Sequence, residues 1–275
     1  MKPMRIGFGF GFGFRFRFIA VILGFGVALL PAEPVPVRHT EGLVHGFLVL
    51  RSLDGDILAS GDLTQVANGD RVTAELTFHF KDGSLHDETS VFLQRGTFRL
   101  LTYHLVQKGP VFKRPTDMTL NASTGQVTVR YSDDGKEKAV TDTLKLPADL
   151  ANGLITTLIR NVDPKATKTM LSMVASTPKP RLGKLAISPD GYDSFSVGSQ
   201  VLKATRYVVK VEIGGVAGAV ASVAGKQPPD THVWVLGGKA PVFLKSEGPL
   251  FDEGPIWRIE LASPIWPKAG TGERP

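Results

Sequence analysis

The chain has no cysteine, and its first 32 residues contain no acidic residue. Without cysteine there is no disulfide framework, no thiolate metal site and no sulfur to carry a lipid anchor. The apolar run at residues 19–32 falls short of the roughly 20 residues that a membrane-spanning helix needs. The absence of cysteine excludes disulfide-stapled and lipid-anchored proteins, and the short apolar run argues against a stable transmembrane span.

A basic segment and an apolar run together begin the chain. Lys2 and Arg5 precede the repeat "GFGFGFGFRFRF", Arg15 and Arg17 lie within it, and "IAVILGFGVALLPA" follows it. This order is typical of a secretory signal peptide. We predict a signal peptide over 1–32, cleaved after Ala32, and an exported protein, periplasmic or extracellular, with no lipid anchor and no stable transmembrane span after cleavage. A mis-assigned start and an uncleaved anchor are the alternatives.

The net charge of the chain depends on this first segment. The whole chain carries +6, and removal of residues 1–32 removes four positive charges and no negative ones, which leaves +2. A nearly neutral chain lacks the basic surface that nucleic-acid binding requires. We therefore expect no nucleic-acid partner.

Alternating hydrophobicity dominates the rest of the chain. In "RVTAELTFHF", residues 71–80, apolar side chains occupy every second position, which indicates a half-buried strand. Turn-forming pairs such as Asn68-Gly69 and Asp82-Gly83 separate this run from similar ones, and they are strong hairpin signals. The fold class is therefore predicted as mainly β, a large curved antiparallel sheet or incomplete β-barrel. The expected organisation is a linker at 33–40, one domain at 41–263 and a disordered tail at 264–275.

One segment has helical periodicity instead. In "LPADLANGLITTLIRNVDP", Leu150, Leu154 and Leu158 recur at intervals of four, which predicts an amphipathic helix over about 147–161 packed on the sheet. The small apolar residues of "IGGVAGAVASVAGKQPPD" suggest a second, short helix over about 215–224. That segment is a plug at one end of the barrel, a flap over an apolar cavity, or a segment that dips into a membrane surface.

Motifs for catalysis or metal binding are missing from the sequence. There is no G-x-S-x-G elbow, and no phosphate loop, because Val220 and Gln227 occupy positions that this motif reserves for Gly and for Ser or Thr. His86 and Asp87 are adjacent, so on a strand their side chains point to opposite faces, and we expect a solvated turn there. We predict no catalytic residue, no metal ligand and no cofactor.

Three stretches carry a resemblance to a known group: "GLVHGFLVLRS", "LPADLANGLITTLIRNV" and "THVWVLGGKAPVFLKSEGPL…WRIEL". With them the chain resembles uncharacterised exported bacterial β-rich proteins similar to the periplasmic lipoprotein carriers of the Lol type. The resemblance implies a half-barrel whose concave face is covered by a helix and holds lipid or acyl chains. It implies no catalytic residue.

The leading hypothesis is a non-catalytic cell-envelope protein that binds an apolar small molecule, lipid or acyl chain in the concave face of the sheet. The residues predicted to line the ligand are Leu76, Phe78, Phe80, Leu150, Leu154, Leu158 and Trp234. The alternative for each of them is that it is an ordinary core residue. The second hypothesis is a structural or protein-interaction module of the envelope, with a filled barrel and an edge strand that recruits a protein partner. The third is an envelope-acting enzyme with a non-standard site.

Overall fold

The computed structural model describes residues 33–133, 135–197, 199–212 and 228–262. Within these ranges it contains one 14-stranded sheet and one α-helix. The elements are β1 (Val44–Arg51), β2 (Ile57–Asn68), β3 (Arg71–Phe80), β4 (Leu85–Arg95), β5 (Thr97–Lys108), β6 (Thr116–Asn121), β7 (Gln126–Asp133), β8 (Lys136–Thr143), α1 (Ile155–Asn161), β9 (Thr169–Ala175), β10 (Arg181–Val197), β11 (Gln200–Glu212), β12 (Thr231–Leu236), β13 (Val242–Pro249) and β14 (Ile256–Leu261).

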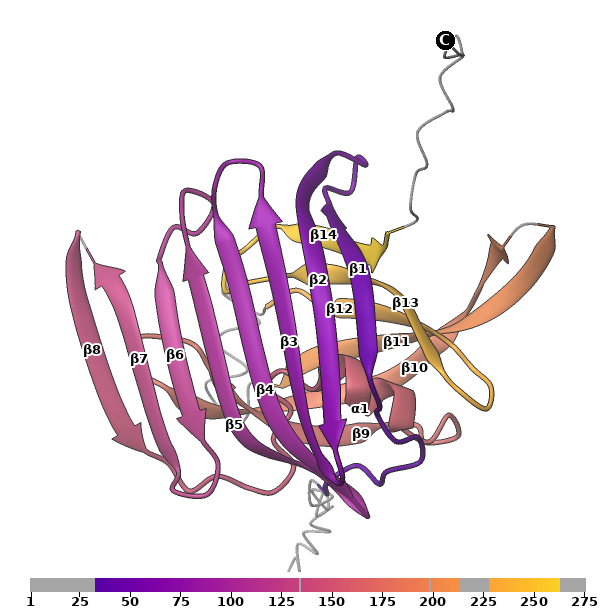
Figure 1. Cartoon of the computed structure of the whole chain (residues 1–275), viewed down its shortest axis with the longest axis horizontal. Helices are drawn as coiled ribbons and strands as arrows, with labels where there is room; N and C mark the ends of the chain where they lie inside the picture. Colours follow the sequence, from indigo (N-terminus) through magenta and orange to yellow (C-terminus); the bar gives the residue numbers. More distant parts are fainter. Residues whose placement is uncertain (1–32, 134, 198, 213–227, 263–275) are drawn as a thin grey trace, which may run out of the picture. The chain divides into compact units, whose positions relative to one another are not determined.

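The strand order reads β8-β7-β6-β5-β4-β3-β2-β1-β14-β13-β12-β11-β10-β9. Neighbouring strands are antiparallel, and β1 pairs with β14 through contacts such as Leu48 with Leu261. Strands β1–β8 form one layer, and the strands from β9 to β14 cross behind it (Figure 1). The two edges, β8 and β9, do not pair with each other. The sheet is therefore curved and not closed, as the sequence predicts.

The hairpins follow from local sequence. Gly69 has a φ of 60°, a left-handed value that only glycine adopts without strain, and it joins β2 to β3. On β3 the side chains of Val72, Ala74, Phe78 and Phe80 are buried while the alternate ones are more exposed. The predicted alternation over 71–80 is thus confirmed, because one face of β3 packs on the core and the other faces out.

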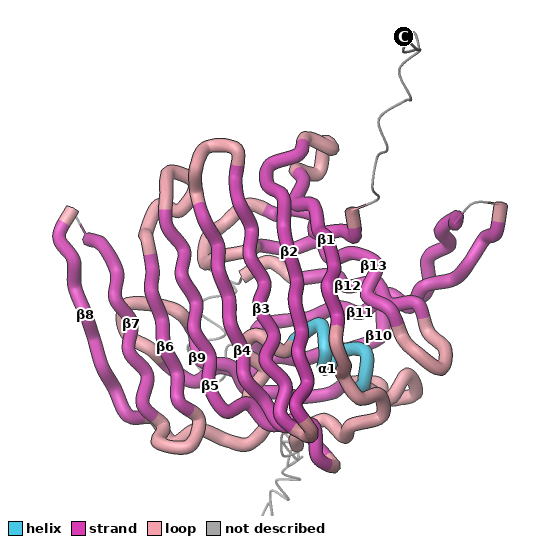
Figure 2. The backbone as a smooth tube through the Cα atoms, viewed as in Figure 1, coloured by secondary structure: helices cyan, strands magenta, loops and turns pink. Residues whose placement is uncertain are grey.

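The helix is present but shorter than predicted. It begins at Ile155 rather than near residue 147. Gly153 has a φ of 68°, which is incompatible with a right-handed helix, so the segment before it forms turns. Asp149 and Asn152, which precede it, bond the edge strand β9 through Ser172 and Val174. Figure 2 shows this helix among the strands.

Two apolar clusters fill the interior. The main core joins buried residues of the first layer, of α1 and of the strands behind, and it includes Phe92, Met118, Val129, Leu154, Ile159, Leu171, Ile187, Tyr207 and Val235. A second cluster contains Leu48, Leu50, Ala59, Phe78, Phe80, Phe112 and Trp257, with Leu76 and Phe251 packed against it. Both layers contribute to the main core, so they are held together by apolar burial.

The segment 33–40, predicted as a linker, packs onto the fold instead. Val35 is buried in the main core, and its carbonyl accepts a hydrogen bond from the N–H of Phe98. The alternating apolar side chains Val35 and Val37 explain this, because they give the segment an inward face. The predicted signal peptide over 1–32, second helix over 215–224 and tail over 264–275 lie outside the described residues.

Candidate functional site

The residues predicted to line a ligand cavity fall into separate places. Leu76, Phe78 and Phe80 lie on the inner face of β3 in the second cluster. The ring of Phe80 lies 5.6 Å, between centroids, from each of the rings of Phe112 and Trp257. These aromatic rings pack against one another, so the side chains predicted from β3 contact core residues in this structure.

The other residues predicted to line the ligand lie in two further places. Leu150, Leu154 and Leu158 are buried in the main core. Trp234 lies on the opposite face of the sheet, because its neighbours Val233 and Val235 point into the main core and side chains alternate along a strand. The structure therefore brings the three leucines together and leaves Trp234 apart from them.

Trp234 is held in a polar network on the outer face of β12. Its indole N–H donates to Asp193 Oδ2 at 2.6 Å, and Lys245 Nζ lies 4.0 Å from its ring centroid. Arg206 also donates to Asp193. The hydrogen bond from Trp234, assisted by the charge of Arg206, lowers the pKa of Asp193 below its ordinary value. This arrangement explains how a large aromatic side chain is covered on an outer face.

A polar layer crosses the inner face between the two clusters. His86 is buried within β4, so the solvated turn predicted there is wrong. Gln107 Nε2 lies 3.1 Å from His86 Nδ1, and His86 Nε2 has no hydrogen-bond partner, with Glu88 Oε2 at 3.5 Å. Burial, reinforced by Glu88, raises the pKa of Tyr103 well above its ordinary value. Neither of the two cavities described below is lined by His86 or Glu88.

A cleft of about 240 Å³ opens beside the C-terminal end of α1, and we call it the basic-rimmed cleft. Its apolar wall is part of the main core, and three basic side chains lie at its rim. The lining residues are Arg38, His39, Ile159, Arg160, Val162, Pro164, Thr205, Tyr207, Val235, Gly237, Gly238 and Pro241. Burial raises the pKa of Tyr207 above its ordinary value.

Hydrogen bonds hold the rim of this cleft in place. Asn161, which is fully buried, accepts from the backbone N–H groups of Arg38 at 2.9 Å and His39 at 2.7 Å. Arg160 donates to the buried carboxylate of Glu41 at 2.6 Å, and Arg38 pairs with Asp163. Neither acid lines the cleft. The charged side chains that line the cleft are therefore basic, and Asp163 lies close enough to Tyr207 to contribute to its raised pKa.

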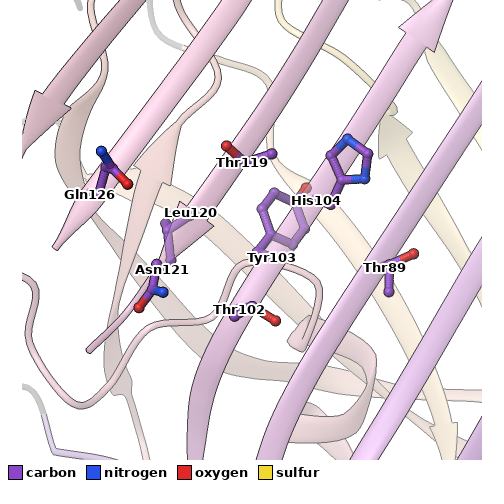
Figure 3. Close-up of a pocket in the computed structure, with 8 residues that line it drawn as sticks. All are labelled: Thr89, Thr102, Tyr103, His104, Thr119, Leu120, Asn121 and Gln126. Atoms are coloured by element: carbon purple, nitrogen blue, oxygen red, sulfur yellow. The ribbon is translucent and has the colours of Figure 1, made fainter. Parts of the chain in front are cut away.

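A larger hollow, of about 360 Å³, lies over strands β4–β7 (Figure 3). Thr89, His104 and Thr119 face each other in register across three of these strands, and Asn121 and Gln126 lie near them (Figure 3). His104 Nε2 lies 3.0 Å from Asp117 Oδ1. Polar side chains line this outer sheet surface, although carbon atoms supply most of its lining. His104 is the one basic side chain among its lining residues.

Sequence reasoning missed the basic-rimmed cleft. Its residues come from the predicted linker, from α1 and from β11 and β12, which are far apart in the chain. The one local signal is Arg160, a basic residue in the last turn of α1. Within the described residues, no group of three or more histidine, aspartate or glutamate side chains is placed to hold a metal ion. No described helix is long and apolar enough to cross a membrane.

Comparison with known proteins returned one structural likeness. No protein-family model and no curated protein matches the chain. The structure is similar to the crystal structure of a beta-barrel-like protein of domain of unknown function DUF1849 from Brucella abortus, with a TM-score of 0.45 and 10% sequence identity. The match covers 86% of this chain and 100% of that one.

Proposed function

We propose that this protein is an exported, non-catalytic cell-envelope protein that binds the apolar end of an anionic ligand in the basic-rimmed cleft. The observation that carries the proposal is the combination of an apolar wall with a basic rim. Ile159, Val162 and Val235 supply buried apolar surface, and His39 and Arg160 lie at the opening. An acyl chain with a carboxylate head fits this arrangement, because burial of its tail and pairing of its head both stabilise the complex.

The size of the cleft restricts the ligand. Its 240 Å³ is below the roughly 300–1,000 Å³ of sites that enclose a drug-sized molecule. The main core already fills the space between the two layers. The proposed ligand is therefore a short acyl chain, whose tail fills the cleft while its carboxylate lies at the rim.

His39 is the rim residue best placed to receive an anion. Its backbone N–H is bonded to Asn161, whereas its imidazole has no hydrogen-bond partner among the described residues. Arg38 and Arg160 each retain guanidinium N–H groups beyond those that pair with Asp163 and Glu41. Export itself is proposed from the basic and apolar order of residues 1–32.

The first experiment is native mass spectrometry of the protein produced with its own N-terminal segment and purified from the envelope fraction without detergent. We expect a mass that fits cleavage after Ala32 and an added mass that denaturation releases as lipid or acyl acid. The stripped protein is then titrated with a saturated fatty acid and with an alkylamine of the same length. The fatty acid is expected to bind, and the amine is not, because the rim is basic.

A blocking variant locates the site. A Cβ added at Gly237 meets no atom within 4 Å, so Gly237→Trp is expected to fold and to fill the cleft. Gly46 on β1 is equally open and does not line the cleft, so Gly46→Trp is the matched control. Loss of fatty-acid uptake in Gly237→Trp alone supports the proposal. Equal uptake by both variants, or no uptake by the unaltered protein, contradicts it.

The filled interior favours a second candidate function, a structural or protein-interaction module of the envelope. In that case the purified protein carries no lipid and takes up none. The polar layer at His86 and Glu88 lines neither cavity, so an enzymatic function has less support than either.

A further inference from the structure

The two edges of the sheet differ in how they are covered. At β9 the N–H of Ala151 donates to Ser172 O, and the N–H of Ser172 donates to Asp149 O. The chain thus covers its own edge there. At β8, within the described residues, no backbone hydrogen bond to a third segment reaches Glu137, Ala139 or Thr141. The edge of β8 is open.

The hydrogen-bonding direction of β8 fixes which backbone groups face outward. The N–H of Leu144 donates to Gly125 O beside β7, and the N–H and C=O of one residue point to the same side of a strand. Directions alternate along the strand. The backbone groups of residues 136, 138, 140 and 142 therefore face β7, and those of Glu137, Ala139 and Thr141 point outward at the edge. The N–H of Thr143 lies on the same side and donates to Asp142 Oδ1, one of the two carboxylate oxygens, at 2.8 Å.

We propose that the open edge of β8 pairs antiparallel with β8 of a second copy of this chain. The outward-facing residues of β8 are odd-numbered, and those of one copy must lie opposite those of the other so that their backbone groups can bond. The residue numbers of any two opposed residues therefore add up to an even number. This condition excludes the register in which Glu137 faces Asp142, where like charges would meet. A two-fold axis at Val140 satisfies it, and there Lys138 of each copy faces Asp142 of the other.

The side chains favour this register. Val140 pairs with Val129 of the main core within one chain, so Val140 of both copies meets on the inner face. The two ion pairs lie on either side of this contact. Lysine on an edge strand ordinarily discourages strand addition. On β8 the two-fold axis places Asp142 of one copy opposite Lys138 of the other. This charge match favours a second copy over an unrelated strand.

The absence of cysteine allows a direct test of the register. The backbone groups of Val140 face β7 of its own chain, so the two copies of Val140 form a non-hydrogen-bonded pair. The Cα atoms of such a pair lie about 4.5 Å apart, a distance that a disulfide can bridge. The full chain with Val140→Cys is expected to form a covalent dimer under mild oxidation. Ala139→Cys is the matched control and is expected to stay monomeric, because Ala139 faces Thr141 in this register.

Charge exchange tests the ion pairs. We expect sedimentation velocity to detect a concentration-dependent dimer of the unaltered chain. Lys138→Asp and Asp142→Lys are each expected to weaken it about tenfold or more, and the double variant to restore it. Both positions are exposed, so circular dichroism is expected to find all three variants folded.

Two results would overturn the proposal. One is an unaltered chain that remains monomeric at every soluble concentration, together with no cross-linking of Val140→Cys. The other is cross-linking through Ala139→Cys in place of Val140→Cys, because it places the two-fold axis at Ala139. Loss of dimerisation in the double exchange variant as severe as in the single variants rejects the ion pairs that define the register.

Discussion

At the scale of single residues, the interior depends on which side chain lies across from which. Gly61 on β2 faces Phe78 on β3, and the ring of Phe78, which is fully buried, occupies the space where a Cβ on Gly61 would lie. Glycine here makes room for an aromatic ring of the neighbouring strand. Its role depends on the register of the β2–β3 hairpin.

We therefore predict that Gly61→Ala lowers the free energy of unfolding by about 1–3 kcal/mol, because the ring of Phe78 must shift within a packed cluster. Urea unfolding followed by circular dichroism measures it. Gly46→Ala on β1 is the control, since its Cβ meets nothing within 4 Å. An equal effect of both substitutions would show that strand propensity, and not the contact with Phe78, determines the cost.

At the scale of elements, α1 both contributes to the main core and positions the cleft. Asn161 in its last turn donates to Thr157 O and accepts from the N–H groups of Arg38 and His39. One buried amide thereby connects the helix to the segment before β1. The basic rim exists because this connection holds two chain segments, more than 120 residues apart, against each other.

Asn161→Ala is predicted to cost about 1–3 kcal/mol of stability, because it leaves partly buried N–H groups without an acceptor. It is also predicted to weaken fatty-acid uptake, since His39 loses its position. Lys168→Ala is the comparison. It removes an exposed ion pair with Glu212 away from the lining of the cleft, and such a pair contributes at most about 1 kcal/mol. Thermal unfolding and the uptake assay separate the two effects, and unchanged uptake in Asn161→Ala would contradict the positioning role.

At the scale of the whole molecule, the two layers share one core. The main core takes side chains from β3–β7, from α1 and from β9–β12. The pairing of β1 with β14 joins the beginning and the end of the described chain. Neither layer can bury its inner face without the other, so the layers are expected to unfold together.

This cooperativity predicts coincident unfolding transitions from two probes. Trp234 and Trp257 lie on β12 and β14, and Trp266 lies outside the described residues. The fluorescence of Trp234 and Trp257 reports on the second layer, whereas far-UV circular dichroism reports on both. The midpoints in urea are expected to agree within error. A tryptophan transition at a lower concentration than the circular dichroism transition would mean that the layers unfold separately.

The sequence by itself determined the local structure. Strict alternation, as in residues 71–80, and turn pairs such as Asn68-Gly69 act over a few residues, so they predict strands and hairpins without knowledge of the rest of the chain. The helical stripe of Leu150, Leu154 and Leu158 likewise predicted a helix. The first half of that predicted helix does not form, because Asp149 and Asn152 bond to β9 and Gly153 turns the chain.

Only the tertiary structure decided where strands and side chains meet. The pairing of β1 with β14, the burial of His86, the outward position of Trp234 and the basic-rimmed cleft depend on residues far apart in the chain. No short pattern records such contacts, because their free energy comes from surfaces that fold together only once the curved sheet has formed. A hydrophobic period predicts that a side chain is buried. The pairing of distant strands determines which residues it packs against.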